Sequence, residues 1–126
     1  MSAQMEKSPW LTEGEQKKES VHNLFSEVAP TYDRVNGLLS LGLHKQWRKR
    51  AVATLNLAEG NSALDACCGT GDFLIPLRHK VGPSGRLVGL DFCQPMLELA
   101  HAKDLNAELL VDDACALPFS GPEFDA

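Results

Sequence analysis

The stretch from Ala63 to Asp72 combines a short apolar run, an acid and a small-residue turn. Gly69 and Gly71 flank Thr70, and Asp65 comes just before the turn. Glycines let the backbone approach a ligand closely, and the first amides of a following helix point toward negative charge. The pattern predicts a strand, a turn and a helix around a nucleoside cofactor. A plain structural turn is the alternative.

The spacing of the glycines separates two kinds of cofactor. Dinucleotide-binding folds use G-x-G-x-x-G, in which the third glycine lets the helix pack closely on the strand. Leu74 stands at that third position. The turn is similar instead to the first motif of class I S-adenosylmethionine methyltransferases, which implies cofactor contacts from Asp65, Gly69, Thr70 and Gly71. A nicotinamide-dependent oxidoreductase is the less favoured enzyme class.

Two further strand-like runs also end in acids. The run 86–90 leads into Asp91, 20 residues after Gly71, which is the distance at which an acid binds ribose hydroxyls. The run 108–111 leads into Asp112, Asp113 and Ala114. In the methyltransferase pattern, Asp113 and Ala114 hold the adenine amine. Each acid alone is more often a turn or cap residue, but three at successive strand ends favour a binding site.

A longer resemblance begins upstream of the turn. Residues 29–47, APTYDRVNGLLSLGLHKQW, resemble the amino-terminal signature of quinone C-methyltransferases of ubiquinone and menaquinone biosynthesis. Residues 89–97 and 113–119 continue the resemblance, which covers about residues 21–126. Cys67 replaces the first glycine of the general methyltransferase motif, and Cys93 replaces a usual serine. Both substitutions are small, so we expect the site to persist.

The resemblance implies C-methylation of a lipid-tailed polyprenyl quinol, with S-adenosylmethionine as the methyl donor. A general base would help, because removing a hydroxyl proton raises the electron density at the ring carbon. The resemblance supplies Tyr32, Asp33, Asn36 and His44 as candidates, and histidine is the residue type that titrates nearest neutrality. Packing or capping roles remain open for these residues. Trp47 is expected in the core.

The order of elements predicts an α/β fold. We expect a partial Rossmann-like class I methyltransferase sheet, with strands one to three, preceded by amino-terminal helices. Helices are expected over 16–28, 32–39, 43–55 and 72–81, with a last one beginning at 93 or 94. The chain divides into a mobile arm (1–14), a helical lid and substrate segment (15–57) and the first half of a cofactor domain (58–126).

The resembled family has a seven-stranded sheet, of which we count three strands here. We therefore expect a truncated methyltransferase in which strand one is an open edge and promotes self-association. Such a chain is expected to bind S-adenosylmethionine weakly and not to methylate a quinol. A non-catalytic cofactor-binding module is the alternative function.

Charge and composition limit the classes of molecule that the chain is expected to bind. A net charge of −5 argues against general nucleic-acid binding. The sequence shows neither a spanning apolar run nor a signal peptide, so we expect a cytoplasmic protein. Lys45, Arg48, Lys49 and Arg50 form a solvated helix face or, alternatively, a peripheral membrane contact. The four cysteines are expected to be small buried thiols without a metal, and the oligomeric state stays open.

Overall fold

The computed structural model describes residues 14–40, 43–119 and 122–126, so the expected mobile arm lies outside the described residues except for Gly14. Three parallel strands form one sheet in the order β1 (Ser62–Asp65), β2 (Arg86–Asp91), β3 (Glu108–Val111). The structure therefore confirms the α/β class and the three predicted strands. Their carboxyl ends share one edge of the sheet.

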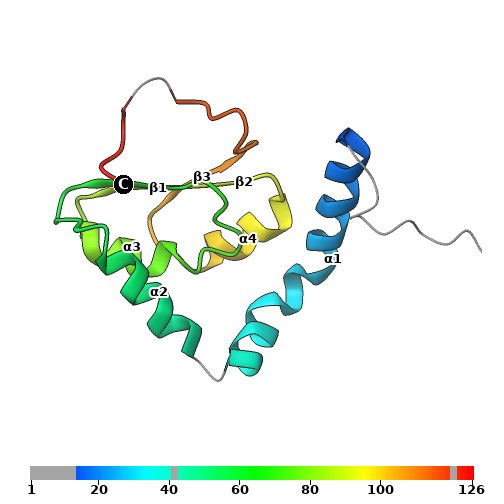
Figure 1. The fold of residues 1–126 in the computed structure, drawn as a ribbon, viewed down its shortest axis with the longest axis horizontal. Coiled ribbons are helices and arrows are strands. Elements are labelled where there is room, and N and C mark those ends of the chain that lie inside the picture. Colours follow the sequence, from blue (N-terminus) through cyan, green and yellow to red (C-terminus); the bar gives the residue numbers. More distant parts are fainter. Residues whose placement is uncertain (1–13, 41–42, 120–121) are drawn as a thin grey trace, which may run out of the picture.

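Two helices connect the strands and lie below the sheet in Figure 1: α3 (Leu74–Val81) and α4 (Gln94–Ala102). Pro76 lies in the first turn of α3, where its missing N–H costs nothing. The helix begins two residues later than the expected position 72. Because each helix crosses between adjacent parallel strands, the turns that precede them lie at the same edge of the sheet.

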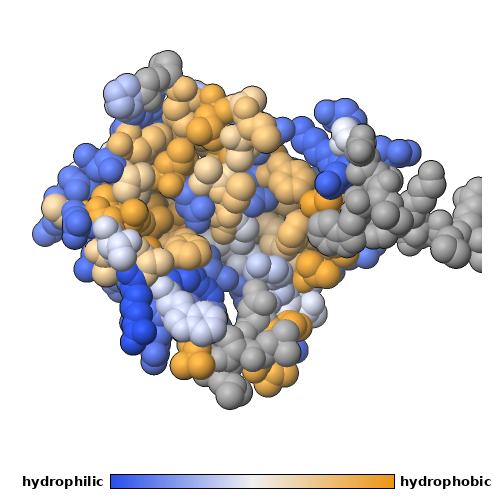
Figure 2. Space-filling model, in the orientation of Figure 1, coloured by the Kyte–Doolittle hydropathy of each residue, from blue (hydrophilic) through white to orange (hydrophobic). Residues whose placement is uncertain are grey.

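The core has two parts. The larger one lies between the sheet and the helices and contains Leu74 and Leu87, both at most 1% exposed. The smaller one joins Ala29, Cys93 and Met96. Met96 packs toward the first helix, whereas its neighbour Leu97 belongs to the larger core, because adjacent helical residues point to different faces of the helix. Figure 2 shows apolar side chains gathered over the sheet region.

The first helix departs most from expectation. One helix, α1 (Gly14–Ser40), replaces the two expected over 16–28 and 32–39 and runs through Pro30. An interior proline removes a backbone hydrogen bond and costs about 3 kcal/mol. The neighbouring Ala29 is only 2% exposed, so burial of this helix face offsets that cost. The helix axis changes direction along its length (Figure 1).

The second helix, α2 (Leu43–Ala53), is two residues shorter than expected and turns a different face inward. Trp47 is 61% exposed and Leu55 47% exposed, whereas Val52 is 2% exposed. The expected core position of Trp47 is therefore wrong. Arg48 was expected on the solvated face, but its side chain is 14% exposed and pairs with Asp72. This ion pair and the burial of Val52 set the rotation of α2.

β1 lies at the edge of the sheet, as expected, but this edge is partly covered by the last residues of the chain. The Leu64 N–H donates to the Ala126 carbonyl at 2.9 Å, and the Asp125 N–H donates to the Ser62 carbonyl at 2.9 Å. The Asp125 carboxylate also accepts the Ser62 N–H at 2.8 Å. Residues 125–126 therefore satisfy backbone groups along this edge of the sheet. No helix within the described ranges is both long and apolar enough to cross a bilayer.

Candidate functional site

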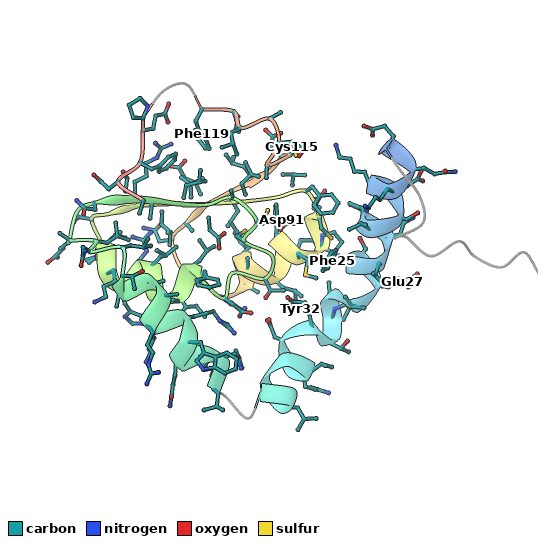
Figure 3. The ribbon with its side chains drawn as sticks, in the orientation of Figure 1. Phe25, Glu27, Tyr32, Asp91, Cys115 and Phe119 are labelled. Carbon is teal, nitrogen blue, oxygen red and sulfur yellow. The ribbon has the colours of Figure 1, made fainter. Side chains whose placement is uncertain are left out.

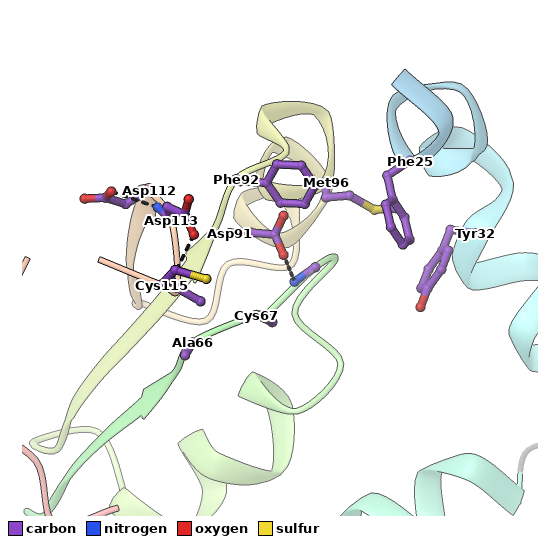
Figure 4. A pocket seen from close by; sticks show the side chains of 12 residues that line it. Phe25, Tyr32, Ala66, Cys67, Asp91, Phe92, Met96, Asp112, Asp113 and Cys115 are labelled. Carbon is purple, nitrogen blue, oxygen red and sulfur yellow. Dashed lines mark hydrogen bonds between the residues drawn. The ribbon is translucent and has the colours of Figure 1, made fainter. Parts of the chain in front are cut away.

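A cavity of about 430 Å³ lies at the carboxyl ends of the three strands (Figure 4). In open α/β sheets this edge is where ligands bind. The cavity is lined by residues from α1, the β1–α3 turn, the start of α4 and the segment after β3: Phe25, Tyr32, Ala66, Cys67, Gly69, Asp91, Phe92, Met96, Asp112, Asp113, Ala114 and Cys115.

Asp91 is held firmly at the end of β2. Its Oδ2 accepts the Gly69 N–H at 3.0 Å, and its Oδ1 accepts the Cys93 N–H at 2.9 Å. Each carboxylate oxygen can accept a further hydrogen bond, so both remain able to bind ligand hydroxyls. The aspartate thus joins the glycine turn to the start of α4 and faces the cavity (Figure 4).

The two turn glycines have different structural roles. Gly69 has φ +54°, and a Cβ there would meet no atom within 4 Å, so its backbone is open to a ligand. Gly71 has φ +89°, and a Cβ there would lie 3.2 Å from the Ala100 Cβ. Leu74 is fully buried, and Gly89 makes room for it, since a Cβ at Gly89 would lie 2.9 Å from the Leu74 Cδ1. This packing removes the need for a third turn glycine.

Asp65 ends β1 but is absent from the cavity lining. Its Oδ1 accepts the Cys67 N–H at 3.4 Å, a long hydrogen bond. Burial raises the pKa of the Asp65 carboxyl, and the nearby charge of Asp91 raises it further. Asp65 lies toward a separate apolar hollow beside Phe73 and Leu77. Its role toward a cofactor stays a prediction.

Asp112, Asp113 and Ala114 all line the cavity after β3. Asp113 is paired with Lys18 of α1 at 2.8 Å and accepts the Cys115 N–H at 2.9 Å. The hydrogen bond from Lys18 and then that from Cys115 lower the pKa of the Asp113 carboxyl. The Asp112 Oδ1 accepts the Asp113 N–H at 2.8 Å. α1 therefore contacts the third acidic strand end.

Of the residues predicted for catalysis, the structure brings Tyr32 to the cavity (Figure 3). Asp33 follows it in α1, but its Oδ1 accepts the Thr70 hydroxyl at 2.6 Å, and Thr70 is 1% exposed. Neither Asp33 nor Thr70 lines the cavity. His44 lies in the first turn of α2, also away from the lining, and the Asn36 side chain lies outside the described part. Roles for these residues stay predictions.

The sequence interpretation did not predict several lining residues, among them Phe25, Phe92 and Met96. Phe92 follows Asp91 directly and packs edge to face with His22 at 5.7 Å between ring centroids. Its position one residue after the predicted ribose ligand was the available signal. Within the described ranges, no group of three His, Cys, Asp or Glu side chains could hold a metal ion.

The cysteines do not share one environment. Cys68 and Cys93 are buried, as expected, but Cys67 and Cys115 are exposed, contrary to expectation. Burial raises the pKa of the Cys68 thiol to about 12, and the charges of Asp65 and Asp91 add to this. A thiol reacts as its thiolate, so Cys68 should be inert.

Iodoacetamide at pH 8 should alkylate Cys115 readily and leave Cys68 unmodified. Because of its raised pKa, we expect Cys68 to react at least about 100-fold more slowly than an ordinary thiol. Peptide mass spectrometry of a time course measures each rate, and the urea-unfolded chain, in which all four cysteines react, is the control. Equal rates at Cys68 and Cys115 in the folded chain would contradict the structure.

The chain is similar in sequence to methyltransferases of two staphylococci. The chain is 42% identical to the demethylmenaquinone methyltransferase of Staphylococcus epidermidis over 118 residues, which is 91% of this chain and 49% of the relative. It is 41% identical to the Staphylococcus carnosus demethylmenaquinone methyltransferase over the same shares. The chain thus spans about half the length of the curated relatives it matches.

Solved structures agree on the fold. A chain of the Haloferax volcanii complex that contains the Trm112 methyltransferase activator matches with a TM-score of 0.59 and 32% identity, covering 75% of this chain and 41% of that one. A SAM-dependent O-methyltransferase of Thermotoga maritima matches with a TM-score of 0.51 and 20% identity, covering 54% and 28%. The latter supports the Rossmann-like fold alone.

The sequence profile of one family, the ubiE/COQ5 methyltransferases, matches residues 12–126. This range contains the glycine turn, all three acidic strand ends and the whole of α1 and α2. The chain belongs to the ubiE/COQ5 methyltransferase family.

Proposed function

We propose that the protein binds S-adenosylmethionine in the cavity at the strand ends and takes part in C-methylation of a lipid-tailed quinol of the demethylmenaquinone type. The observation that carries the proposal is Asp91, fixed at the end of β2 by the Gly69 and Cys93 amides and open to ligand hydroxyls. The similarity to demethylmenaquinone methyltransferases supports the acceptor class. Because the chain spans half of their length, the acceptor is proposed by similarity.

The cavity residues fit this cofactor at both of its ends. Asp91 would accept the ribose hydroxyls, and the open backbone at Gly69 would lie against the amino-acid end. Asp113 and Ala114 would contact the adenine amine, because the family resemblance aligns these two residues with the adenine-binding motif. Apolar contacts would come from the Phe92 ring and the Met96 side chain.

The cofactor would supply a methyl group already activated by its sulfonium, so the protein has no nucleophile to provide. Its residues would position the donor and acceptor and exclude water. Tyr32, Asp33 and His44 are our candidates for handling the acceptor proton. Tyr32 is the first choice, because its side chain lines the cavity.

We further propose a cytoplasmic protein that contacts the membrane surface to reach its lipid-tailed acceptor. Lys45, Lys49 and Arg50 support this contact, because they are exposed on α2 in a chain of net negative charge. Basic side chains are attracted to anionic lipid headgroups by about 1 kcal/mol each. Figure 2 shows the hydrophilic side chains that project at the lower edge, where α2 lies.

Methyl-labelled S-adenosylmethionine and a short-tailed demethylmenaquinol test the proposed reaction. Because the chain spans about half the length of its relatives, we expect the chain alone to bind the cofactor and transfer no label. Joined to the remaining half of the Staphylococcus epidermidis relative, it should place label on the quinol ring, and none on a menaquinol whose ring position already carries a methyl group. Cofactor binding without transfer by the joined chain would favour the non-catalytic module. Equal labelling of both quinols would contradict C-methylation at that position.

A further inference from the structure

Lys103, at the end of α4, contacts three side chains that lie outside the cavity lining. Its Nζ lies 3.0 Å from the Asp33 Oδ2 and 3.3 Å from the Asp72 Oδ1, and it donates to the Thr70 Oγ1 at 3.4 Å. Asp33 belongs to α1, whereas Thr70 and Asp72 belong to the turn after β1. One ammonium group therefore joins α4, α1 and the cofactor turn.

Charges of opposite sign alternate through this cluster. Arg48 of α2 lies 3.4 Å from the Asp72 Oδ2, and Asp72 and Asp33 lie on either side of Lys103. The side chains of Arg48, Asp72 and Lys103 are 14%, 28% and 24% exposed, and that of Asp33 is 40% exposed. Partly buried pairs are screened by salt less than surface pairs, so this network has more effect than exposed ion pairs. We call Arg48, Asp33, Thr70, Asp72 and Lys103 the latch.

The latch connects the wall of the cavity to its floor. Asp33 follows Tyr32, whose side chain lines the cavity, and Thr70 follows Gly69, whose N–H binds Asp91. Figure 3 shows Tyr32 and Phe25 on the side of α1 that faces Asp91. A shift of Asp33 would therefore move Tyr32 at the wall and release Thr70 at the turn.

Pro30 makes this anchoring necessary. It removes one backbone hydrogen bond from α1, so the part after Pro30 is tied to the first part less firmly than in a regular helix. Apolar packing on α4 at Ala29 and Met96 anchors the helix up to this point. Tyr32 packs against the edge of the same cluster, and the first charged contact after Pro30 is the Asp33 carboxylate, held by Thr70 and Lys103.

We propose that Lys103 is a positioning residue that holds Asp33 against Thr70, keeps the Tyr32 part of α1 over the cavity, and so couples the position of α1 to cofactor binding. The coupling to cofactor binding rests on the proposed function, whereas the positioning of Asp33 and Tyr32 does not. Coupling is reciprocal, so bound cofactor should also slow the local opening of α1. Asp33 is then an anchor for α1, with both carboxylate oxygens occupied.

Lys103→Met tests the latch, because it removes the ammonium group and keeps an unbranched apolar stem. Tyr32 is the one tyrosine of the chain, so incorporated 3-fluorotyrosine gives a single fluorine signal beside the latch. We expect Lys103→Met to shift or broaden this signal and to raise amide exchange over residues 28–35 about tenfold, as for loss of a charged hydrogen-bond partner. S-adenosylmethionine affinity should fall about tenfold.

Matched variants separate positioning from general damage. Lys80→Met makes the same substitution at an exposed residue of α3. It should change neither the fluorine signal nor the amide exchange of residues 28–35, and it should leave the cofactor affinity as it is. Thr70→Val should change the fluorine signal and the amide exchange in the same way as Lys103→Met. Thr70→Ser, which keeps the hydroxyl, should give the fluorine signal of the unmodified chain. Unchanged fluorine signal and exchange in Lys103→Met would overturn the latch. Faster exchange of equal size in β2 would also overturn it, since the effect would then be global.

The two proposals fail in different ways. If the unmodified chain binds no S-adenosylmethionine but Lys103→Met still frees residues 28–35, the latch stands and the proposed function fails. If the cofactor binds with equal affinity to both chains although α1 is freed in Lys103→Met, the coupling is wrong and cofactor binding stands.

Discussion

Asp91→Ala should weaken S-adenosylmethionine binding about 10- to 100-fold. The variant removes a charged acceptor for the ribose hydroxyls, which costs about 1.5–3 kcal/mol, and a tenfold change in affinity corresponds to about 1.4 kcal/mol. It also releases the Gly69 and Cys93 amides that the carboxylate now fixes. Isothermal titration calorimetry of the two chains measures the difference directly.

Asp112→Ala is the matched control. It removes a carboxylate from the same cavity, and this carboxylate accepts the N–H of the neighbouring Asp113. We expect a loss of affinity below about threefold, since a local hydrogen bond of this kind contributes about 0.5 kcal/mol. If the Asp91 and Asp112 variants lost equal affinity for S-adenosylmethionine, the prediction that the ribose binds at the end of β2 would be contradicted.

Gly71→Ala should have the largest effect on folding among changes in the cofactor turn. Backbone at φ +89° is strained for alanine by about 1–3 kcal/mol. The added Cβ would also lie 3.2 Å from the Ala100 Cβ and 3.5 Å from its Cα, so overpacking against α4 adds a further cost of about 1 kcal/mol. Urea unfolding should give a lower free energy of unfolding for Gly71→Ala than for the unmodified chain.

Gly69→Ala provides the contrast for Gly71→Ala. Its Cβ would meet no atom within 4 Å and φ is +54°, so only the left-handed conformation carries a cost, of about 1–2 kcal/mol. Since Gly69 lines the cavity, its added methyl group should reduce cofactor affinity more than stability. If Gly69→Ala destabilised the fold as much as Gly71→Ala, the different roles assigned to the two glycines would be wrong.

The strands and their acidic ends could be predicted from the sequence because their signals are local. Short apolar runs end directly at Asp65, Asp91 and Asp112, and the parallel sheet then brings these ends to one edge. The helices between the strands could be predicted from the positions of proline and glycine. Pro76 and Pro95 each lie in the first turn of a helix, α3 and α4 respectively. The position of Asp91 needed no knowledge of distant contacts.

The amino-terminal helices could not be predicted in the same way. Local rules end a helix before Pro30, but burial of Ala29 against α4 continues it. Apolar spacing placed Trp47 inside, but the pairing of Arg48 with Asp72 and the burial of Val52 turn α2 the other way. Both outcomes depend on partners far away along the chain.

The latch is hidden from sequence interpretation for the same reason. Lys103 and Asp33 are 70 positions apart, and neither stands in a motif that requires the other. The resemblance offers Asp33 as a candidate for handling the acceptor proton, and this role stays a prediction. Its contacts with Thr70 and Lys103 could be found only from the structure.

A calorimetric titration of the chain with S-adenosylmethionine and, separately, with NADH tests the central claim most directly. We predict saturable binding of S-adenosylmethionine at one site, weakened in Asp91→Ala, and no measurable binding of NADH. Saturable binding of NADH without binding of S-adenosylmethionine would contradict the claim that this cavity is a methyl-donor site.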